Sequence, residues 1–342
     1  ASGERWVVRP NRGRVPFWLA LPSRRVGGTR LRDYLGAWRL ARAGPDQTVA
    51  DCLERAGPLW RRFWEPLARA VLNTPPEQAS ARLLRAALVE SFAGGGRACR
   101  PLVARHSLAA SLIDPAVRRL RERGVAIAFG HRLRALERQD GRVQGLDFGQ
   151  RRVELGAGDR LILALPPAPT GALLPELRVP CGSHAIVNGH FRLARPTRLP
   201  GGAQLLGLIG GTAEWLFLRD ELVSLTVSAA DDLAEEPSAT IAARLWADTA
   251  RALGLPAAPQ PPGRIVKERR ATFAQTPAAV ARRPGATTAW PNLFLAGDWT
   301  ATGLPATIEG AVRSGQRAAD LAEAGVDGRA HRAGGRDSLS DR

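Results

Sequence analysis

One stretch near the carboxyl end, "NLFLAGDWTATGLPATIEGAVRSG" at residues 292–315, constrains the fold more than any other part of the sequence. Its apolar start predicts a buried strand that ends at a Gly297-Asp298 corner. After a loop rich in turn residues, a helix is predicted to begin near Ala306. In open α/β sheets, ligands bind outside the carboxyl ends of the strands. The order of strand, corner and helix therefore predicts a ligand site at Asp298 and at the start of this helix.

The residue types at this corner suit a flavin. The Asp298 carboxylate can accept hydrogen bonds from a polyol, and Gly297 permits a close approach of the backbone. Unpaired N–H groups at the start of a helix favour an anion, or a ring that becomes negative on reduction. A reduced flavin combines a polyol, a pyrophosphate and such a ring. The residues alone leave a second interpretation open, in which the segment is only a strand packed against a helix.

The rest of the sequence predicts a mixed fold of the α/β or α+β class. Helical periodicity dominates the first part of the chain, and alternating apolar residues indicate strands over most of the middle. Thr48, with Asp51 three residues on, is a predicted N-cap. The i, i+3, i+4, i+7 spacing predicts one helical face made of Trp60, Phe63, Trp64 and Leu67. The predicted elements are helices within 30–93, at 114–124 and at 237–253, strands at 125–129, 160–167, within 185–230 and at 264–273, and a strand meander at 133–155 that turns at Asp140-Gly141. This order suggests a cofactor-binding body and a separate substrate-side cover.

Several of these segments resemble known flavoproteins. The stretch at 292–315 and its continuation "QRAADLA" resemble the carboxyl-terminal flavin motif of the amine oxidase and phytoene desaturase superfamily. The segments "GVAIAFGHRLRAL", "DGRVQGLDF" and "DRLILALPP" are similar to the second flavin-domain segment of that superfamily. A narrower resemblance, to the hydroxysqualene dehydroxylase family of FAD-dependent, squalene-associated enzymes, is carried by "GERWVVRPNRGRVPFW", "LWRRFWEPLARAVLNTPPEQASARLL", "GGRACRPLVAR", "IVNGHFRL", "LLGLIGGTAEWLF" and "VKERRATFAQTP". It covers residues 3–324.

The resemblance implies an FAD/NAD(P)-binding, Rossmann-like flavoprotein fold with a mixed sheet-plus-helix substrate domain, and FAD as the cofactor. It places the ribityl chain at Asp298 and the pyrimidine edge of the ring at the start of the following helix. The adenine end would lie against the backbone of Leu133, and the turn at Pro166 would border the flavin. The cofactor-binding residues implied in this way are Leu133, Pro166, Gly297, Asp298, Thr307, Ile308, Glu309 and Gly310.

The family begins with a strand, a G-x-G-x-x-G turn and a helix, a combination that this sequence does not contain. We therefore expect an amino-terminally truncated flavoprotein, and weak or no retention of FAD by these residues alone. The expected parts are a helical substrate-side segment at 1–98, an FAD-domain segment with the strand meander at 99–178, a substrate-domain sheet and helix at 179–263, a carboxyl-terminal FAD-domain segment at 264–325 and a disordered tail at 326–342.

The implied reaction is the reductive dehydroxylation of hydroxysqualene to squalene, for bacterial hopanoid synthesis. Candidates for the acid that protonates the leaving hydroxyl are Glu214, Glu309 and Asp298, with His190 a weaker one. Of these, Asp298 is expected to bind the ribityl chain instead. Candidate residues lining a site for the long isoprenoid are Trp60, Phe63, Trp64, Trp215 and Phe217. The sequence leaves open that the carboxylates are surface or helix-start charges and that the aromatic residues belong to an ordinary core.

The formal net charge is +17, and Lys267 is the only lysine among 49 basic residues. So many arginines, spread along the chain, fit either a compositional habit of the genome or attraction to an anionic membrane surface. No motif favours nucleic acid as a partner. No apolar run reaches the ~20 residues of a membrane-spanning helix. The sequence favours a cytoplasmic protein, with docking at the periphery of the inner membrane as an option, and it does not predict the oligomeric state.

The three cysteines, Cys52, Cys99 and Cys181, lack the spacing of metal ligands, and no metal site is expected. Two other functions stay open beside the dehydroxylase. One is a carotenoid-type desaturase or an amine oxidase of the same superfamily, the latter disfavoured because the chain has one tyrosine for an aromatic cage. The other is a truncated remnant without cofactor that binds a membrane or a protein partner.

Overall fold

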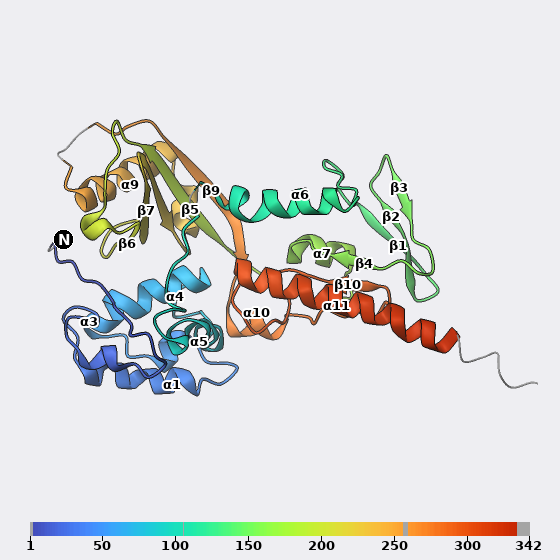
Figure 1. The fold of residues 1–342 in the computed structure, drawn as a ribbon, viewed down its shortest axis with the longest axis horizontal. Helices are drawn as coiled ribbons and strands as arrows, with labels where there is room; N and C mark the ends of the chain where they lie inside the picture. Colours follow the sequence, from blue (N-terminus) through green and yellow to red (C-terminus); the bar gives the residue numbers. More distant parts are fainter. Residues whose placement is uncertain (1–2, 105, 256–258, 334–342) are drawn as a thin grey trace, which may run out of the picture. The chain divides into compact units, whose positions relative to one another are not determined.

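The computed structural model describes residues 3–104, 106–255 and 259–333 of the 342-residue chain (Figure 1). The chain divides into two compact units. Unit 1 comprises residues 1–115 and 182–278, and unit 2 comprises residues 116–181 and 279–342. Helices and strands occur in both units, as the predicted mixed fold class requires. The assignment of substrate-side and cofactor-side roles to particular ranges stays a prediction.

The first part of unit 1 is built from short helices. The predicted cap at Thr48 is confirmed, because Thr48 N donates to Asp51 Oδ2 at 2.8 Å and Asp51 N donates to Thr48 Oγ1 at 3.2 Å. The elements are η1 (Phe17–Ala20), η2 (Leu31–Gly36), α1 (Ala37–Ala41), α2 (Val49–Cys52), α3 (Gly57–Leu59), the π-helical turn η3 (Trp60–Trp64), α4 (Glu65–Leu72), α5 (Ala81–Glu90), η4 (Phe92–Gly94) and the π-helical turn η5 (Ala109–Ile113).

One buried asparagine joins these helices to the sheet of unit 1. Asn73 ends α4 in the left-handed conformation, with φ of 44°. Its side-chain amide donates to the carbonyl of His184 at 3.1 Å and to Oγ1 of Thr272 at 3.0 Å. Its side-chain oxygen accepts from Ala229 N at 2.7 Å. All four hydrogen-bonding groups lie within unit 1, so the helix end is fixed to three separate segments of the sheet region.

The sheet of unit 1 is antiparallel and has the strand order β6-β7-β8-β5-β9. It consists of β5 (Ser183–Arg192), β6 (Leu205–Gly207), β7 (Trp215–Arg219), β8 (Leu222–Val227) and β9 (Gly263–Phe273), with η6 (Pro200–Gly202) before β6 and α8 (Asp231–Glu235) and α9 (Ser238–Leu253) after β8. The strands predicted within 185–230 and at 264–273 and the helix predicted at 237–253 are confirmed.

The helix α9 covers one face of this sheet. Its Ile241 and Leu245 are fully buried against Phe191, Leu216 and other apolar residues of the strands. Gly189 allows this approach, since a Cβ there would lie 2.6 Å from Cδ1 of Leu245. The residues that alternate with the buried ones point to the other face, which α9 does not cover.

Unit 2 contains two small sheets. β1 (Ala135–Gln139), β2 (Arg142–Asp147) and β3 (Arg152–Glu154) form the predicted antiparallel meander, and the turn residues Asp140 and Gly141 have φ of 51° and 70°. β4 (Leu161–Leu163) pairs in parallel with β10 (Leu293–Leu295). The side chain of Asn292 joins the two sheets, because it exchanges two hydrogen bonds with the backbone of Val143 at 2.8 and 3.1 Å.

Four further helices complete the chain: α6 (Asp114–Glu122), α7 (Pro167–Leu173), α10 (Pro277–Ala281) and α11 (Ile308–Ala333). α11 packs on β10 through Ala318 and Ala322, which contact Phe294 and Ala296. The sequence predicted a disordered tail from residue 326, whereas α11 continues to Ala333 because no proline interrupts it. The rest of that predicted tail, 334–342, lies outside the described residues.

One predicted strand is wrong. Residues 125–129 do not pair with any described strand, and Val125 and Phe129 are exposed. The apolar pattern was real, but a strand also needs a hydrogen-bonded neighbour. Among the described residues, no helix combines the length and the apolar run needed to cross a bilayer.

Candidate active site

β10 ends in a corner that only glycine fits. Gly297 has φ of 142°, and a Cβ built on it would lie 2.7 Å from Nε1 of Trp299. The Trp299 side chain is buried, and its indole N–H donates to the carbonyl of Leu165 at 2.9 Å. Leu165 follows β4, so this indole joins the carboxyl ends of the two parallel strands. The close approach predicted at Gly297 is that of a side chain from the same loop.

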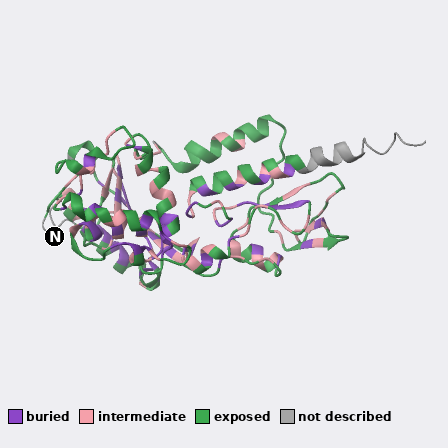
Figure 2. Cartoon of the chain, turned by 90° about the horizontal axis from the view of Figure 1, so that it is seen from below, coloured by how far each residue is buried: buried purple, intermediate pink, exposed green. Residues whose placement is uncertain are grey.

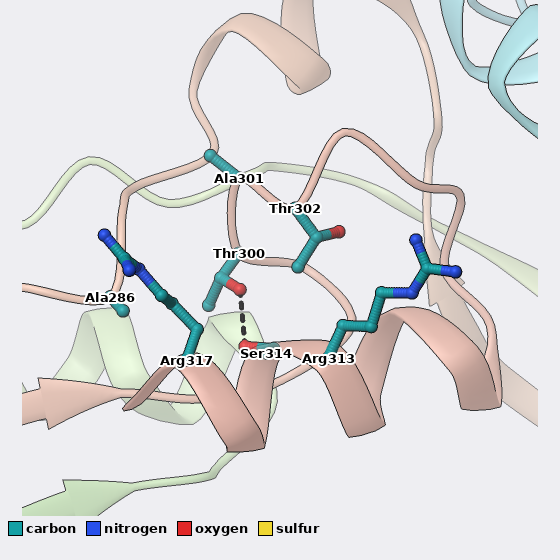
Figure 3. Close-up of a pocket in the computed structure, with 7 residues that line it drawn as sticks. All are labelled: Ala286, Thr300, Ala301, Thr302, Arg313, Ser314 and Arg317. Atoms are coloured by element: carbon teal, nitrogen blue, oxygen red, sulfur yellow. Dashed lines mark hydrogen bonds between the residues drawn. The ribbon is translucent and has the colours of Figure 1, made fainter. Parts of the chain in front are cut away.

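Three polar groups fasten this corner to α11 (Figure 3). Gly297 N donates to Oγ of Ser314 at 3.0 Å, and the hydroxyls of Ser314 and Thr300 are 2.7 Å apart. Thr300 Oγ1 in turn donates to the carbonyl of Gly297 at 3.0 Å. Ser314 and Thr300 are almost fully buried. The hydrogen bonds therefore form a closed set that fixes the corner on the helix.

Arg283 holds the loop after the corner from the inside. Its guanidinium donates to the carbonyl oxygens of Trp299 at 3.3 Å, Leu304 at 2.7 Å, Asp298 at 3.0 Å and Thr300, and to Oγ1 of Thr302 at 3.2 Å. Burial lowers the pKa of Arg283 to about 10, and the Asp298 carboxylate acts in the opposite direction. The guanidinium is therefore charged at neutral pH and keeps all its donors.

The Asp298 carboxyl lies half-buried at the end of β10. Burial raises the pKa of Asp298 above its ordinary value of 3.8, whereas the Arg283 guanidinium and the backbone N–H groups of Asp298 and Trp299 lower it. A buried carboxylate is costly unless it is well paired. Its position is suited to accept hydrogen bonds from hydroxyl groups of a bound polyol.

The start of α11 offers two N–H groups. Thr307 caps the helix, because its Oγ1 accepts from Gly310 N at 3.1 Å. The N–H groups of Ile308 and Glu309 have no hydrogen-bond partner in the described part of the chain. A Cβ on Gly310 would lie 2.8 Å from the carbonyl O of Pro305, so this glycine lets the helix approach its own loop. The two N–H groups and the positive end of the helix dipole fit the ring edge of a reduced flavin.

The other predicted cofactor residues also lie in unit 2. Pro166 follows β4 at the same sheet end as Asp298, and Leu133 lies two residues before β1. The Glu309 side chain is exposed and pairs with Arg313, whose Nε is 2.6 Å from Glu309 Oε1. These roles stay predictions, but every residue in the cofactor set belongs to one unit.

A cavity of about 280 Å³ lies beside the corner, between the loop and α11 (Figure 3). It is lined by Ala286, Thr300, Ala301, Thr302, Arg313, Ser314 and Arg317. The side chains of Arg313 and Arg317 project from the helix on either side of Ser314. The cavity lining does not include Asp298 or the first turn of α11, so it is not where the ribityl chain is predicted.

The predicted substrate residues lie in unit 1, in two groups. Trp215 and Phe217 are half-buried on the sheet face that α9 leaves uncovered. The pairings Trp215↔Thr226, Phe217↔Ser224 and His190↔Ser224 place His190 on the same face. Nδ1 of His190 lies 2.9 Å from Ser224 Oγ, and burial, with Arg219 and Arg264 adding to it, lowers the pKa of His190. The imidazole is therefore neutral at pH 7.

The second group is part of the helical core. Trp60 and Trp64 of η3 are buried, and the Phe63 ring contacts Trp64 and Phe92 at centroid distances of 4.9 and 5.6 Å. Their predicted helical face is confirmed as a packed face. The cavity beside the Gly297-Asp298 corner is lined by other residues.

The Glu214 carboxyl group accepts hydrogen bonds from one side chain and from one backbone N–H. Its Oε1 accepts from Arg69 Nε at 2.8 Å, its Oε2 accepts from Ser228 N at 3.1 Å, and 13% of its side chain is exposed. Its predicted role as a proton donor stays untested.

Two of the residues that build the Gly297-Asp298 corner and its loop, Arg283 and Trp299, were not predicted from the sequence. The Arg283 bonds run to a loop 15 to 21 positions further on, and Trp299 reaches Leu165 across 134 positions. Only the Arg-Pro pair before the strand and a tryptophan directly after the Gly-Asp corner could have drawn attention to them.

A parallel strand pair, a glycine–aspartate corner at its carboxyl end and a helix that starts with unpaired N–H groups together agree with the flavin site predicted from the sequence. The chain belongs to the flavin-containing amine oxidoreductase family, whose model matches residues 35–322. FAD is therefore its cofactor.

Three relatives at 39–47% identity share one name, hydroxysqualene dehydroxylase. The chain is 47% identical over 321 residues to the hydroxysqualene dehydroxylase of Rhodopseudomonas palustris, which covers 94% of the chain and 76% of that protein. Identity is 46% to the Sinorhizobium fredii enzyme and 39% to the Zymomonas mobilis enzyme of the same name, each over 93% of the chain and 76% of the relative. The resemblance to this family that the sequence predicts is confirmed.

Solved structures agree on the fold. An oxidoreductase from Methanosarcina mazei aligns with a TM-score of 0.63 at 13% identity, over 90% of this chain and 75% of its own. A redesigned putrescine oxidase aligns with a TM-score of 0.55 at 18% identity, over 85% and 73%. At such low identity these likenesses support the flavoprotein fold and nothing finer.

Proposed function

We propose that this chain is an FAD-dependent oxidoreductase of isoprenoid metabolism that converts hydroxysqualene to squalene. The observation that carries this proposal is the 47% identity, over nearly the whole chain, to a protein named hydroxysqualene dehydroxylase. The corner at Gly297 and Asp298 and the open start of α11 support it, because they supply what a flavin needs. A carotenoid-type desaturase and an amine oxidase use related folds and stay as alternatives for the test.

The proposed reaction replaces a C–OH bond by a C–H bond. One hydride and one proton enter, and the hydroxyl leaves as water. Bound reduced FAD would supply the hydride, and it would be left oxidised by two electrons. The remaining work falls to the protein, which must hold the cofactor, orient a long apolar chain, keep water away and deliver the proton.

Asp298 and α11 are proposed to hold the cofactor. The Asp298 carboxylate would accept hydrogen bonds from the ribityl hydroxyls. The N–H groups of Ile308 and Glu309 would donate to the ring edge that gains negative charge on reduction. Leu133, Pro166, Thr307 and Gly310 would shape the surface along which the cofactor lies.

The sheet face of unit 1 opposite α9 is proposed to bind the isoprenoid. Trp215 and Phe217 give it an apolar surface, and burial of apolar area contributes about 25 cal/mol per Å². A C30 chain has few polar groups, so shape and exclusion of water should dominate its affinity. Trp60, Phe63 and Trp64 were predicted for the same role, and their packing in the helical core supports a contribution to the shape of the unit.

The identity of the proton donor is the most detailed part of the proposal. Glu214 and Glu309 stay predicted donors, and both oxygens of the Glu214 carboxyl accept hydrogen bonds, from Arg69 and from the backbone N–H of Ser228. His190 shares the face with Trp215 and Phe217, and it is an additional candidate for positioning the hydroxyl. A positioned acid contributes about 10²–10⁴-fold to the rate. Glu214→Gln, Glu309→Gln and His190→Asn should therefore differ clearly in turnover and in its pH profile.

The test is an anaerobic incubation of the protein with chemically reduced FAD and hydroxysqualene, followed by chromatography of the lipids. Squalene should form, and the flavin absorbance should return in equal molar amount. Parallel incubations replace the substrate by a carotenoid precursor and by a panel of amines with oxidised FAD. Turnover of these compounds, with none of hydroxysqualene, would assign the chain to one of the alternatives.

We also propose that the protein works in the cytoplasm at the periphery of the inner membrane. Its proposed substrate and product are hydrocarbons that partition into bilayers. The net charge of +17 favours an anionic lipid surface. Fractionation of cells that produce the protein should place it with membranes at low salt and release it at high salt.

A further inference from the structure

We propose that the amino-terminal part of unit 1 carries a docking surface for an anionic lipid bilayer, here named the N-terminal patch. This inference rests on the proposed isoprenoid substrate and goes beyond it by assigning the surface. The apolar members of the patch are Phe17, Leu21, Leu31, Leu35 and Trp38, and the basic members are Arg12, Arg14, Arg24 and Arg39.

The apolar side chains of the patch are unusually exposed. Phe17 is 70% exposed, Leu35 67% and Trp38 54%. Leu35 and Trp38 are three residues apart where the 3₁₀ helix η2 runs into α1, so they lie on nearly the same side of this segment. A single exposed leucine needs no explanation, but a group of large apolar residues marks an interaction site.

Buried side chains join the two helical turns η1 and η2, which carry most of the patch. The buried rings of Trp18 and Tyr34 meet edge to face with centroids 6.2 Å apart. The hydroxyl of Tyr34 accepts from Val26 N at 3.1 Å, so the segment between the turns is fixed as well. Phe17 and Leu35 are exposed, and each is the chain neighbour of one of the two rings that join η1 to η2. Figure 2 shows exposed residues, in green, next to buried ones around the amino terminus.

The positive charge of residues 3–42 favours an anionic membrane as the partner. Residues 3–42 contain ten arginines and two carboxylates, Glu4 and Asp33. Glu4 is paired with Arg62 at 2.6 Å, and Asp33 accepts from Arg30 N at 2.7 Å, so both carboxylates are engaged. The side chains of Arg14 and Arg39 form no ion pair in the part of the chain that the structure describes. Exposed apolar residues interleaved with unpaired arginines fit the headgroup layer of an anionic membrane.

Trp38 has the position of an interfacial anchor. The guanidinium carbon of Arg42 lies 5.3 Å from the centre of its ring. A tryptophan with an arginine on its face offers an apolar body to the acyl chains and a charge to the phosphates, as in the aromatic belts of membrane proteins. A docked patch would bring the protein to the bilayer in which its proposed substrate dissolves.

The test is flotation of the purified protein with vesicles of phosphatidylcholine alone and of phosphatidylcholine mixed with phosphatidylglycerol. We expect binding to the mixed vesicles that weakens as salt is raised. Arg14→Gln with Arg39→Gln should lower the partition coefficient about fivefold for each arginine. Phe17→Ser with Leu35→Ser should lower it about tenfold or more, because two large apolar side chains no longer enter the bilayer.

Matched variants control for general charge and exposure. Val89→Ser removes an apolar residue that is 57% exposed on α5, and Arg151→Gln with Arg178→Gln removes two exposed arginines of unit 2. Both controls should float like the unmodified protein. Absence of vesicle binding, or equal loss in patch and control variants, would overturn the proposal. A patch variant that changes only the oligomeric state would identify the patch as a contact between two copies.

The same variants separate this proposal from the proposed function. Dehydroxylation is measured once with detergent-dispersed hydroxysqualene and once with hydroxysqualene in the mixed vesicles. The patch variants should retain turnover in detergent and lose it on vesicles. Vesicle binding without turnover in either assay would contradict the proposed function and leave the patch standing. Turnover on vesicles that is unaffected by the patch changes would contradict the patch alone.

Discussion

At the scale of single residues, Arg283 fixes the loop that follows the Gly297-Asp298 corner. Five oxygen atoms of the loop 298–304 accept hydrogen bonds from its guanidinium. Four of them are backbone carbonyls, which water would otherwise have to satisfy. A planar guanidinium can serve so many acceptors at once, whereas an ammonium group is a point charge with three donors. Arg283 is thus a positioning residue for Asp298.

We expect Arg283→Met to lower the free energy of unfolding by about 3 kcal/mol, because several buried oxygens lose their donor. Arg283→Lys should fall between this variant and the unmodified protein. Both should weaken FAD binding, measured by titration of the quenching of flavin fluorescence.

Arg282→Met is the control for Arg283. The neighbouring side chain is exposed and makes one hydrogen bond, from its Nε to the carbonyl of Val179 at 3.0 Å. Its free energy of unfolding, measured in urea, should change by about 0.5 kcal/mol or less. An Arg283→Met protein as stable as Arg282→Met would show that the loop does not depend on the guanidinium.

The Asp298 carboxyl makes the free energy of unfolding depend on pH. Burial raises its pKa in the folded state, so its contribution to stability is present below the ordinary value of 3.8 and is lost as the pH rises through the raised pKa. Asp298→Asn should therefore be more stable than the unmodified protein at neutral pH without cofactor. The difference in free energy of unfolding should shrink as the pH is lowered toward 3.8.

The same change should weaken FAD binding about tenfold or more, since a hydrogen bond to a charged group contributes about 1.5–3 kcal/mol. A variant that gains stability while it loses affinity would identify Asp298 as a residue kept for binding. Equal losses of stability and affinity would instead mean that its carboxylate supports the loop.

At the scale of elements, the sequence predicted the turns, caps and helices that depend on residues close together in the chain. The turn at Asp140-Gly141, the cap at Thr48 and the helix α9 depend on residues close together in the chain, and all three are observed. The strand predicted at 125–129 failed because pairing depends on a neighbouring strand, which no local pattern reveals. The corner was predicted as a strand followed by a helix, but the residues that fix it, Arg283 and Trp299, act across long sequence separations.

Variants of Thr307 measure how much the N-cap of α11 contributes to the free energy of unfolding. Thr307→Ala removes the acceptor of Gly310 N and should lower the free energy of unfolding by about 1 kcal/mol. Thr307→Ser keeps the hydroxyl and should be nearly neutral. Thermal denaturation of the three proteins gives the ranking, and an equal loss in both variants would mean that the methyl group, not the cap, is what stabilises this turn.

At the scale of the whole molecule, the two units differ in how much apolar surface they bury. Most of the buried apolar residues lie in unit 1, where α9 and the five-stranded sheet form a large core. Unit 2 has two small sheets, and several of its apolar side chains are exposed, among them Phe129, Ile162, Ile308 and Val312. Apolar burial is the dominant stabilising contribution in folding. Unit 2 should therefore be the less stable of the two.

This difference predicts two transitions in calorimetry of the protein without cofactor, the lower from unit 2. All residues predicted to bind FAD belong to unit 2, and a ligand stabilises the state that binds it. Added FAD should therefore raise the lower transition, by about 2.7 kcal/mol of free energy at a hundred times the dissociation constant, and move the upper one little. Limited proteolysis near the lower midpoint, with the fragments read by mass spectrometry, assigns each transition to its unit. Asp298→Asn serves as the control, since FAD should shift its lower transition less. A single cooperative transition, or a shift confined to the upper one, would contradict both the stability order of the units and the placement of the cofactor site in unit 2.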